Sequence, residues 1–476
     1  MNRQIIALAA AAASVLPVCA LRTASIYSDH MVLQQQTQAR ISGFASPGKR
    51  VSITPSWPGA ATATAVTDRD GRWQVSVTTP EASYTPYTIN ISTPDSTVNL
   101  SDVLVGEVWI ASGQSNMEMP LRGFWTQPVR GARRAIATAR HYPGVRMATV
   151  PKAGAYEPKA DTDTRWLTST PANATDFSAL AYFFARHLND LLDVPVGIIS
   201  CAYGGSKVEG WLPKRILDTY PHWNMDAERD STLREWERIG VMYNAMLLPV
   251  APYTARGFLW NQGESNVGRH DEYPRHQADM VAHWRELWGD STAAMPFYFV
   301  ELPGWEYSDP QGTDAALFRE CQHRAAQLIP NSGIVCTSDL VDETEIDDIH
   351  ASRKEEIGER MALMAGARTY GIDGLPYTYP TFRSMDIDGD TATLHFDNAS
   401  HGFTPNENLQ GFEVAGTDGV FHPAEAREVY DTRDIAVTRT AGVDRICAVR
   451  YCFRNFAVGR VHDLYGMPLV PFRTDR

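Results

Sequence analysis

Residues 103–112 read VLVGEVWIAS, a largely apolar run that is followed at once by the polar hexapeptide GQSNME, residues 113–118. A continuous apolar run of this length predicts a strand buried on both faces, as in a parallel sheet. Similar runs recur farther along the chain, at 194–200, 255–262, 296–302 and 332–338. Helix-like segments lie between or after them, at 177–192, 271–289, 317–329 and 351–367. This alternation predicts an α/β domain with a parallel sheet over residues 101–375.

The segments on either side of this domain have a different pattern. Short alternating runs such as RVSITP, RWQVSVTT and YTINIST are separated by turn clusters, which predicts a β-sandwich module at 21–100. From Pro376 the chain returns to alternating strands such as MDIDGDTATLHFDN, which predicts a second all-β module at 376–476. We therefore expect an α/β domain flanked by two β modules.

The first twenty residues have the pattern of a cleavable secretory signal. Arg3 is followed by an apolar run from Ile5 to Val18, and the run closes with Val18-Cys19-Ala20. The protein is therefore expected to be exported, to the periplasm or the medium. Cys19 raises the alternative of a lipid anchor, which Val18 disfavours. Since no other segment is apolar enough to cross a bilayer, no membrane span is expected.

Composition narrows the functional classes. Of 476 residues, 43% are hydrophobic and 21% charged, which excludes a disordered or polytopic membrane protein. The net charge of −13 repels phosphate backbones, so nucleic acid is not an expected partner. Five cysteines remain besides Cys19, and the sequence has neither a CxxC pair nor an HExxH motif. We expect no metal, no other cofactor, and few or no disulfides.

Four polar segments are candidates for chemistry. In the first, GQSNME, Ser115 stands on a sharp strand-to-helix turn, which suits either a nucleophile or an N-capping serine. The second, AYGGSKVEGW at 202–211, offers glycines at a strand end, and the third, WNQGESN at 260–266, offers side-chain amides. The fourth, DDIH at 347–350, places a histidine after two carboxylates. Imidazole has the pKa that a base for a serine hydroxyl needs.

In this order the four segments resemble the SGNH-type hydrolases, and more closely the sialate O-acetylesterase family of carbohydrate esterases. The resemblance covers most of the chain and rests on a combination of blocks. These are IYSDHMVLQQ (26–35), GEVWIASGQSNMEMPL (106–121), YNAMLLPV (243–250), GFLWNQGESN (257–266), LFRECQ (317–322) and DIHASRKEEIGERMAL (348–363). It implies a three-layer SGNH-like α/β domain.

The resemblance also implies roles for single residues. Ser115 would be the nucleophile and His350 the general base, later the general acid. An aspartate before His350 would orient the imidazole. The spacing D-x-x-H favours Asp347, and Asp348 is kept in reserve. We expect the pKa of His350 to stay within about one unit of its ordinary value of about 6.5.

The implied oxyanion hole combines backbone and side-chain donors. The backbone N–H of Ser115 would act together with that of Gly204 or Gly205. A side-chain amide would complete it, with Gln262 preferred and Asn266 second.

The implied function is that of a secreted serine esterase that removes O-acetyl groups from sugars, with sialic acid esters as the leading substrate. An esterase for acetylated xylan or xyloglucan is the alternative within enzymes, and a non-catalytic carbohydrate-binding protein is the alternative outside them. Two positions depart from the family. Ala351 stands where Pro is usual, and Lys207 lies in a glycine loop that differs from that of the relatives. The second departure leaves the sugar open, and the oligomeric state is open too.

Overall fold

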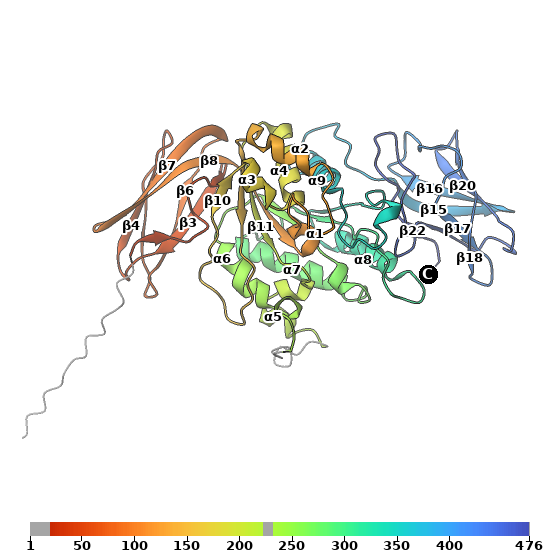
Figure 1. Ribbon diagram of the computed structural model, residues 1–476, viewed down its shortest axis with the longest axis horizontal. Helices are drawn as coiled ribbons and strands as arrows, with labels where there is room; N and C mark the ends of the chain where they lie inside the picture. Colours follow the sequence, from red (N-terminus) through yellow and green to blue (C-terminus); the bar gives the residue numbers. More distant parts are fainter. Residues whose placement is uncertain (1–19, 222–231, 476) are drawn as a thin grey trace, which may run out of the picture.

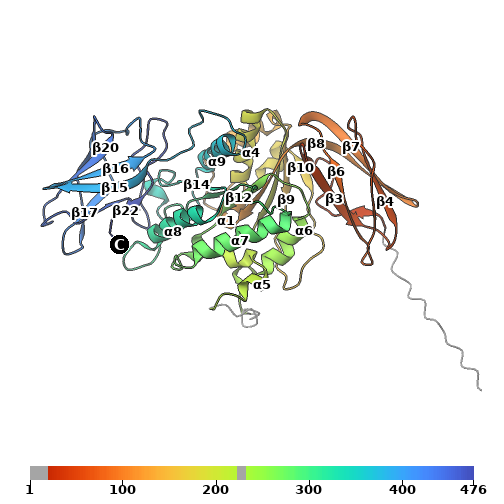
Figure 2. The ribbon, with the colours of Figure 1, turned by 180° about the vertical axis from the view of Figure 1, so that it is seen from behind.

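The structure is a computed structural model that describes residues 20–221 and 232–475. An N-terminal β module, a central α/β domain and a C-terminal β module follow one another along the long axis (Figure 1, and from behind in Figure 2). The prediction of β modules at both ends of an α/β domain is confirmed. The predicted signal segment, with Cys19, lies outside the described residues except for its last position.

The central sheet is built around β8 (Ser96–Gly113), an 18-residue strand. The strand order is β10-β9-β11-β8-β12-β13-β14. All neighbours from β9 to β14 pair in parallel, and β10 pairs antiparallel at the edge. The bounds of these strands are β9 Val145–Thr149, β10 Trp166–Thr168, β11 Val196–Ala202, β12 Gly257–Asn261, β13 Phe297–Val300 and β14 Ser332–Val335. The sheet as a whole is mixed, because antiparallel strands of the N-terminal module join it through β8.

Helices cover both faces of this sheet. Trp109 of β8 packs its ring against Phe184 of α4 (Ala179–Leu192), in the core that also holds α9 (Lys354–Arg368). Phe258 of β12 packs against Trp284 of α7 (Tyr273–Trp288), in the core that also holds α8 (Asp314–Leu328). Successive strand residues point to opposite faces, so each strand contributes to both cores. The shorter helices are α1 Ser115–Glu118, α2 Ala132–Thr138, α3 Pro171–Thr175, α5 Lys214–Leu217 and α6 Leu248–Val250.

In the part of the chain that the structure describes, no helix has both the length and the apolar composition needed to cross a membrane.

The N-terminal module shares a strand with the α/β domain. One of its layers is the sheet β1-β3-β6, and the other contains β2, β4, β5, β7 and the first half of β8. The bounds are β1 Arg22–Thr23, β2 Val32–Gln34, β3 Gln38–Phe44, β4 Arg50–Pro55, β5 Ala63–Val66, β6 Arg72–Thr78 and β7 Ser83–Thr93. The domain boundary that we placed after residue 100 therefore lies inside β8, which runs without a break from the module into the central sheet.

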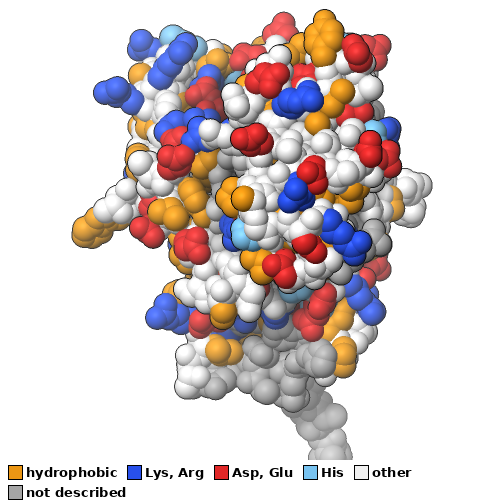
Figure 3. Space-filling view, turned by 90° about the vertical axis from the view of Figure 1, so that its right-hand side faces the viewer, with side chains coloured by type: hydrophobic (Ala, Val, Ile, Leu, Met, Phe, Trp, Pro, Cys, Tyr) orange, Lys and Arg blue, Asp and Glu red, His pale blue; other side chains and the backbone are white. Residues whose placement is uncertain are grey.

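The C-terminal module has two four-stranded sheets, β15-β16-β20-β19 and β18-β17-β21-β22, which enclose a separate apolar core. The bounds are β15 Thr381–Asp388, β16 Thr391–Asp397, β17 Phe412–Ala415, β18 Phe421–Pro423, β19 Ala426–Val429, β20 Asp434–Thr438, β21 Ala448–Tyr451 and β22 Phe472–Arg473. Acidic and basic side chains are interspersed over the end of the molecule that this module forms (Figure 3). Such a mixture is typical of a solvated surface.

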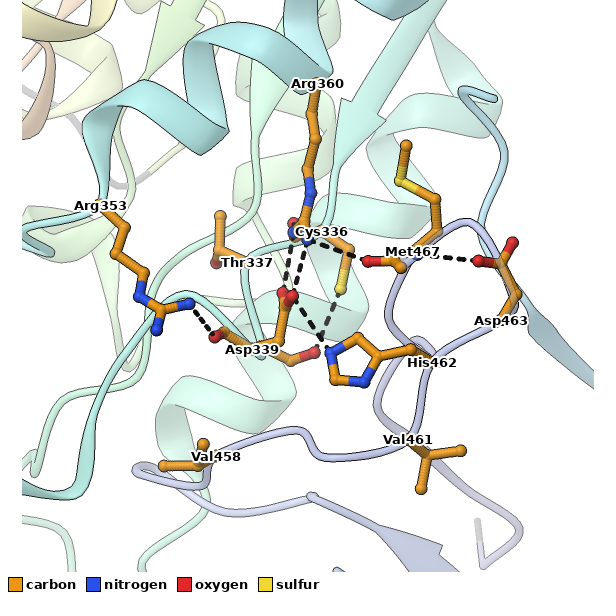
Figure 4. A network of polar contacts seen from close by, with 12 residues as sticks. Cys336, Thr337, Asp339, Arg353, Arg360, Val458, Val461, His462, Asp463 and Met467 are labelled. Atoms are coloured by element: carbon orange, nitrogen blue, oxygen red, sulfur yellow. Dashed lines mark hydrogen bonds and ion pairs between the residues drawn. The ribbon is translucent and has the colours of Figure 1, made fainter. Parts of the chain in front are cut away.

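The C-terminal module contacts the segment between β14 and α9. Asp339 in this segment accepts hydrogen bonds from Arg360 of α9 at 2.6 and 2.8 Å, and His462 of the C-terminal module lies 3.3 Å from it (Figure 4). Although burial alone raises the pKa of Asp339, the hydrogen bonds from Arg360 and His462 hold it below its usual value. The same segment carries the predicted aspartates and His350. The C-terminal module therefore contacts, through His462, the segment that holds these residues.

Candidate active site

The carboxyl end of β8 lies where the strand order of the sheet reverses. Along the chain, β9 and β11 are added on one side of β8, whereas β12, β13 and β14 are added on the other. Ligands bind at such a point in open α/β sheets, beyond the carboxyl ends of the strands. Three of the four predicted segments follow strands at this edge: 113–118 after β8, 202–211 after β11 and 260–266 after β12.

Ser115 is the first residue of α1, a single helical turn directly after β8. The chain turns at Gly113, whose φ is 139°, and a Cβ there would lie 2.1 Å from the backbone oxygen of Asn261. Only glycine fits this position, because a side chain would collide with β12. The N-cap residue of α1 is Gln114, so the alternative interpretation of Ser115 as an N-capping serine is wrong. Ser115 is half-buried, so it stays accessible from solvent.

The glycine loop after β11 lies against Ser115. A Cβ on Gly204 would be only 3.4 Å from the Cβ of Ser115. The backbone N–H of Gly204 donates to Oε2 of Glu118 at 2.6 Å, so this predicted oxyanion donor already has an acceptor. Gly205 has a φ of 80°, and its carbonyl accepts a hydrogen bond from Ser265 Oγ at 2.9 Å. The structure therefore brings the glycine loop, the amide loop and Ser115 together.

The two predicted amide donors are buried beneath the loop surface. Nε2 of Gln262 donates to Oε1 of Gln114 at 3.0 Å and to Oδ1 of Asn266 at 2.7 Å, and its oxygen accepts from the Tyr273 hydroxyl at 3.0 Å. Nδ2 of Asn266 donates to the Glu209 carboxylate at 3.1 and 3.3 Å. Each of the two amide residues is 1% exposed. Their N–H groups thus have protein acceptors, and the network ends at Gln114.

Gln114, which directly precedes Ser115, is the end of this hydrogen-bond network. Its oxygen accepts from Gln262 and lies 3.4 Å from the backbone nitrogens of Gly263 and Ser265. Within residues 20–221 and 232–475, its Nε2 makes no hydrogen bond, although the residue is only 2% exposed. A fixed amide with a spare donor beside the nucleophile position is what an oxyanion hole requires.

Asn116 connects the serine loop to the histidine loop. Its Nδ2 donates to the backbone carbonyl of Ile349 at 3.0 Å. Asn116 follows Ser115, and Ile349 precedes His350. The structure therefore joins the loop that carries Ser115 to the loop that carries His350, although 233 residues separate the two bonded positions.

A buried charged cluster lies behind this bond. Lys354, the first residue of α9, is fully buried and donates from Nζ to Oδ1 of Asn116 at 2.5 Å. Burial lowers the pKa of Lys354 to about 7, although the nearby Glu264 favours the charged form. Asn116 also donates to Glu264, whose other oxygen, Oε2, has no hydrogen-bond partner in the described structure. Burial raises the pKa of Glu264.

His350 is held by residues of a turn that precedes α2. Its Nδ1 lies 2.5 Å from Oε1 of Gln127, and Nε2 of Gln127 donates to Oδ1 of Asp348 at 3.2 Å. The Phe124 ring meets the imidazole edge to face, with ring centroids 5.0 Å apart. Asp347 is exposed, and in the described part of the chain no hydrogen bond joins it to His350. The expected reach back across one turn is therefore absent, and Asp348 approaches the imidazole through Gln127.

The environment of His350 favours its neutral form. Burial, and next the positive charge of Lys354, lower the pKa of His350 to about 4, while Asp348 opposes them weakly. Our prediction that this pKa stays near its ordinary value is wrong. It assumed a carboxylate in direct contact with Nδ1, whereas the structure has a neutral amide there and a buried cation nearby.

Among the described residues, no group of three or more histidine, cysteine, aspartate or glutamate side chains could hold a metal ion. The five described cysteines are free thiols, and four of them are buried.

Several residues of the site were not predicted from the sequence. Asn116 and Glu264 lie inside the quoted motifs, so their positions next to Ser115 and within the amide loop were the available signal. Lys354 lies in the run SRKEE, which has the pattern of a solvated helix start. Gln127 lies in FWTQPV, which carries no motif, and only the tertiary structure shows its contact with His350.

An accessible hydroxyl and a neutral imidazole on adjoining loops, at the carboxyl edge of a mostly parallel sheet, are the groups that nucleophilic attack on an ester carbonyl requires. The fold and the site have the features of a carboxylic ester hydrolase. The chain belongs to the carbohydrate esterase family described as sialic acid-specific acetylesterase, whose model matches residues 105–366.

Individual relatives agree with this assignment. The chain is 26% identical to the sialate O-acetylesterase of Mus musculus over 498 residues, covering 91% of this chain and 90% of the relative. It is 28% identical to the sialate O-acetylesterase of Homo sapiens over 398 residues, covering 77% and 74% of the two chains. Its structure is similar to that of a carbohydrate acetylesterase from Xanthomonas citri, with a TM-score of 0.84 and 30% identity over 95% of this chain and 99% of that chain.

Proposed function

We propose that the protein is an exported serine esterase that removes O-acetyl groups from sugars, with O-acetylated sialic acids as the leading substrates. The observation that supports the mechanism is the hydrogen bond from Asn116 to the carbonyl of Ile349, because it joins the neighbour of Ser115 to the neighbour of His350. The family and the mammalian relatives support the ester and the sugar. The apolar run between Arg3 and Ala20 supports export.

The reaction passes through an acetyl-enzyme. Oγ of Ser115 attacks the acetyl carbonyl carbon, while Nε2 of His350 accepts the hydroxyl proton. The tetrahedral intermediate collapses as the bond to the sugar oxygen breaks, and His350 returns the proton to that oxygen. Water, deprotonated by His350, then attacks the acetyl group on Ser115 and releases acetate. No cofactor enters any of these steps.

The negative charge that develops on the carbonyl oxygen needs hydrogen-bond donors. We assign the backbone N–H of Ser115 and Nε2 of Gln114 to this role, because Gln114 is adjacent and its oxygen is fixed by Gln262. Gln262 and Asn266 then act as supports for Gln114. The N–H of Gly204 lies beside Ser115 and would join the donors when Glu118 releases it.

Acetylated xylan or xyloglucan remains the second substrate class. The Xanthomonas citri protein, which is 30% identical over nearly the whole chain, is a carbohydrate acetylesterase, a description that is not restricted to sialic acid. The alternative of a non-catalytic carbohydrate-binding protein is wrong, because the chain belongs to an esterase family.

The test is acetate release from a panel of O-acetylated sialic acids and acetylated xylo-oligosaccharides by the purified protein. We expect release with wild type and none with Ser115→Ala, and no effect of EDTA. Ser76→Ala, an exposed serine of the N-terminal module, is the matched control and should behave as wild type. Turnover by Ser115→Ala, or activity lost on chelation, would overturn the proposed mechanism. Preference within the panel decides between the two substrate classes.

A further inference from the structure

We infer that Gln127 is the positioning residue of His350, in the place where a carboxylate was expected, and that Asp348 orients the imidazole only through Gln127. The inference rests on the proposed function, in which His350 is the base for Ser115. Gln127 lies in no sequence motif.

A tight turn presents Gln127 to the imidazole. The backbone N–H of Phe124 donates to the carbonyl of Gln127 at 3.1 Å, and the N–H of Gln127 donates to the carbonyl of Phe124 at 3.2 Å. Trp125 and Thr126 therefore form the tip of a two-residue turn, with Thr126 at a φ of 64°. The residues at its base, Phe124 and Gln127, both contact His350. One local element thus holds the ring by packing and by a hydrogen bond.

Asp348 fixes which way the Gln127 amide faces. A carboxylate only accepts hydrogen bonds, so the amide nitrogen of Gln127 must face Asp348, at 3.2 Å. The amide oxygen then faces Nδ1 of His350, at 2.5 Å. Because this oxygen also only accepts, Nδ1 must carry the proton. The other ring nitrogen, Nε2, is left with a free lone pair, which is the tautomer that a base for Ser115 needs.

A neutral amide in this place has a consequence for the charge of the ring. A carboxylate at Nδ1 stabilises the imidazolium ion, whereas an amide oxygen orients the ring without adding a negative charge. The charged groups that act on the ring are Lys354 of α9 and Asp348 of its own loop, and Lys354 has the larger effect. The turn that carries Gln127 adds no charge. His350 therefore stays neutral, and ready to accept a proton, in mildly acidic solution.

The experiment compares Gln127→Glu and Gln127→Leu with wild type in pH profiles of kcat/KM on a neutral acetyl ester. Gln127→Glu keeps an acceptor at Nδ1 and adds a negative charge, so its acid limb should move to higher pH by about one unit or more. Gln127→Leu removes the acceptor, so kcat should fall by about 10²-fold with KM nearly unchanged. Gln410→Glu, at an exposed glutamine of the C-terminal module, is the control for added charge and should leave the profile in place.

Ser115→Ala, measured in parallel, distinguishes a failure of the proposed function from a failure of the role of Gln127 alone. If Ser115→Ala turns over substrate, the proposed function fails and the role of Gln127 fails with it. If Ser115→Ala is inactive, a Gln127→Leu variant with wild-type kcat, or a Gln127→Glu profile that coincides with wild type, overturns the role of Gln127 alone. Should Gln127→Leu fail to fold, the Gln127→Glu profile decides, because this variant retains the acceptor at Nδ1 of His350 and adds a negative charge.

Discussion

Nδ2 of Asn116 donates a hydrogen bond to the backbone carbonyl of Ile349 across 3.0 Å, and this bond sets the position of the histidine loop against the serine loop. The same side chain accepts from the buried ammonium of Lys354 at 2.5 Å. One asparagine therefore connects a loop that follows the central strand to the start of the last helix of the α/β domain. The geometry of the proposed site depends on it, although it does not touch the reacting ester in our mechanism.

Asn116→Ala should lower both stability and turnover. Lys354 would lose its acceptor in a buried site, and an unpaired buried polar group costs about 1–3 kcal/mol. The loss of the bond to Ile349 should also misplace His350, so kcat should fall by more than tenfold, roughly what a misplaced catalytic group costs. Thermal unfolding and kcat are the measurements. Asn99→Ala, at an exposed asparagine of β8, is the control, and equal results for the two variants would contradict the role of Asn116.

The acid limb of the pH profile should lie near pH 4. Burial and Lys354 lower the pKa of His350 to about 4, and only the neutral imidazole accepts the proton of Ser115. The rate therefore rises as pH increases through this value and is level from mildly acidic to neutral pH. A limb centred at the ordinary histidine pKa of about 6.5 would show that the imidazole is not buried as in the structure.

Lys354→Met should move that limb to higher pH. Removing the positive charge removes one of the two causes that lower the pKa of His350, whereas the burial of the ring remains. The measurement is kcat/KM against pH for the variant and wild type, with melting temperatures to confirm folding. A limb that stays in place, or moves to lower pH, would exclude the effect of Lys354 on His350.

Asp348→Asn should impair turnover more than Asp347→Asn. An amide at position 348 can donate as well as accept, so it no longer fixes the orientation of Gln127. Asp347 is exposed, and substitutions at such positions change stability by about 0.5 kcal/mol or less. The comparison of kcat for the two variants decides. A larger loss in Asp347→Asn would restore the assignment that spacing alone favoured.

Gln114→Ala should reduce kcat by about 10²–10³-fold, the usual cost of one oxyanion donor, and change KM little. Gln114→Glu tests the same role at nearly constant volume, because it replaces the free amide nitrogen with an oxygen that cannot donate when ionised. We expect a loss of similar size. If both variants keep more than a tenth of the wild-type kcat, the donor is elsewhere, and Gln262 or Gly204 returns as the candidate.

The central strands were predictable because their apolar runs are long and uninterrupted. Residues 103–112 lie within β8, and the later runs correspond to β11, β12, β13 and β14. The boundary at residue 100 could not be predicted correctly from the sequence, because β8 continues through Ser101 and Asp102, whose polar side chains resemble those of a linker. A composition change in the sequence thus marks a change of environment along one strand, and not a break between two domains.

The contacts of the site could be predicted only in part. Ser115 and His350 lie in segments whose order and spacing carry chemical meaning. The hydrogen bond between Gln127 and His350 joins residues that are 223 positions apart and follows no periodicity, so no local sequence pattern predicts it. Lys354 stands in a charged run that predicts solvent exposure, but the packing of α9 against the loops buries it completely. Burial is a tertiary property, and the burial of His350 lowers the pKa of its imidazole first, with the charge of the buried Lys354 second.

The most direct test of the account is to trap the acetyl-enzyme. Wild-type protein turning over an acetylated substrate is quenched in acid, digested and analysed by mass spectrometry. We predict that the peptide containing Ser115 carries the mass of one acetyl group, that this acetyl group disappears when the substrate is exhausted, and that Ser115→Ala carries none. An acetyl group on a different side chain, or turnover with Ser115 unmodified and replaceable, would contradict the claim that Ser115 is the nucleophile.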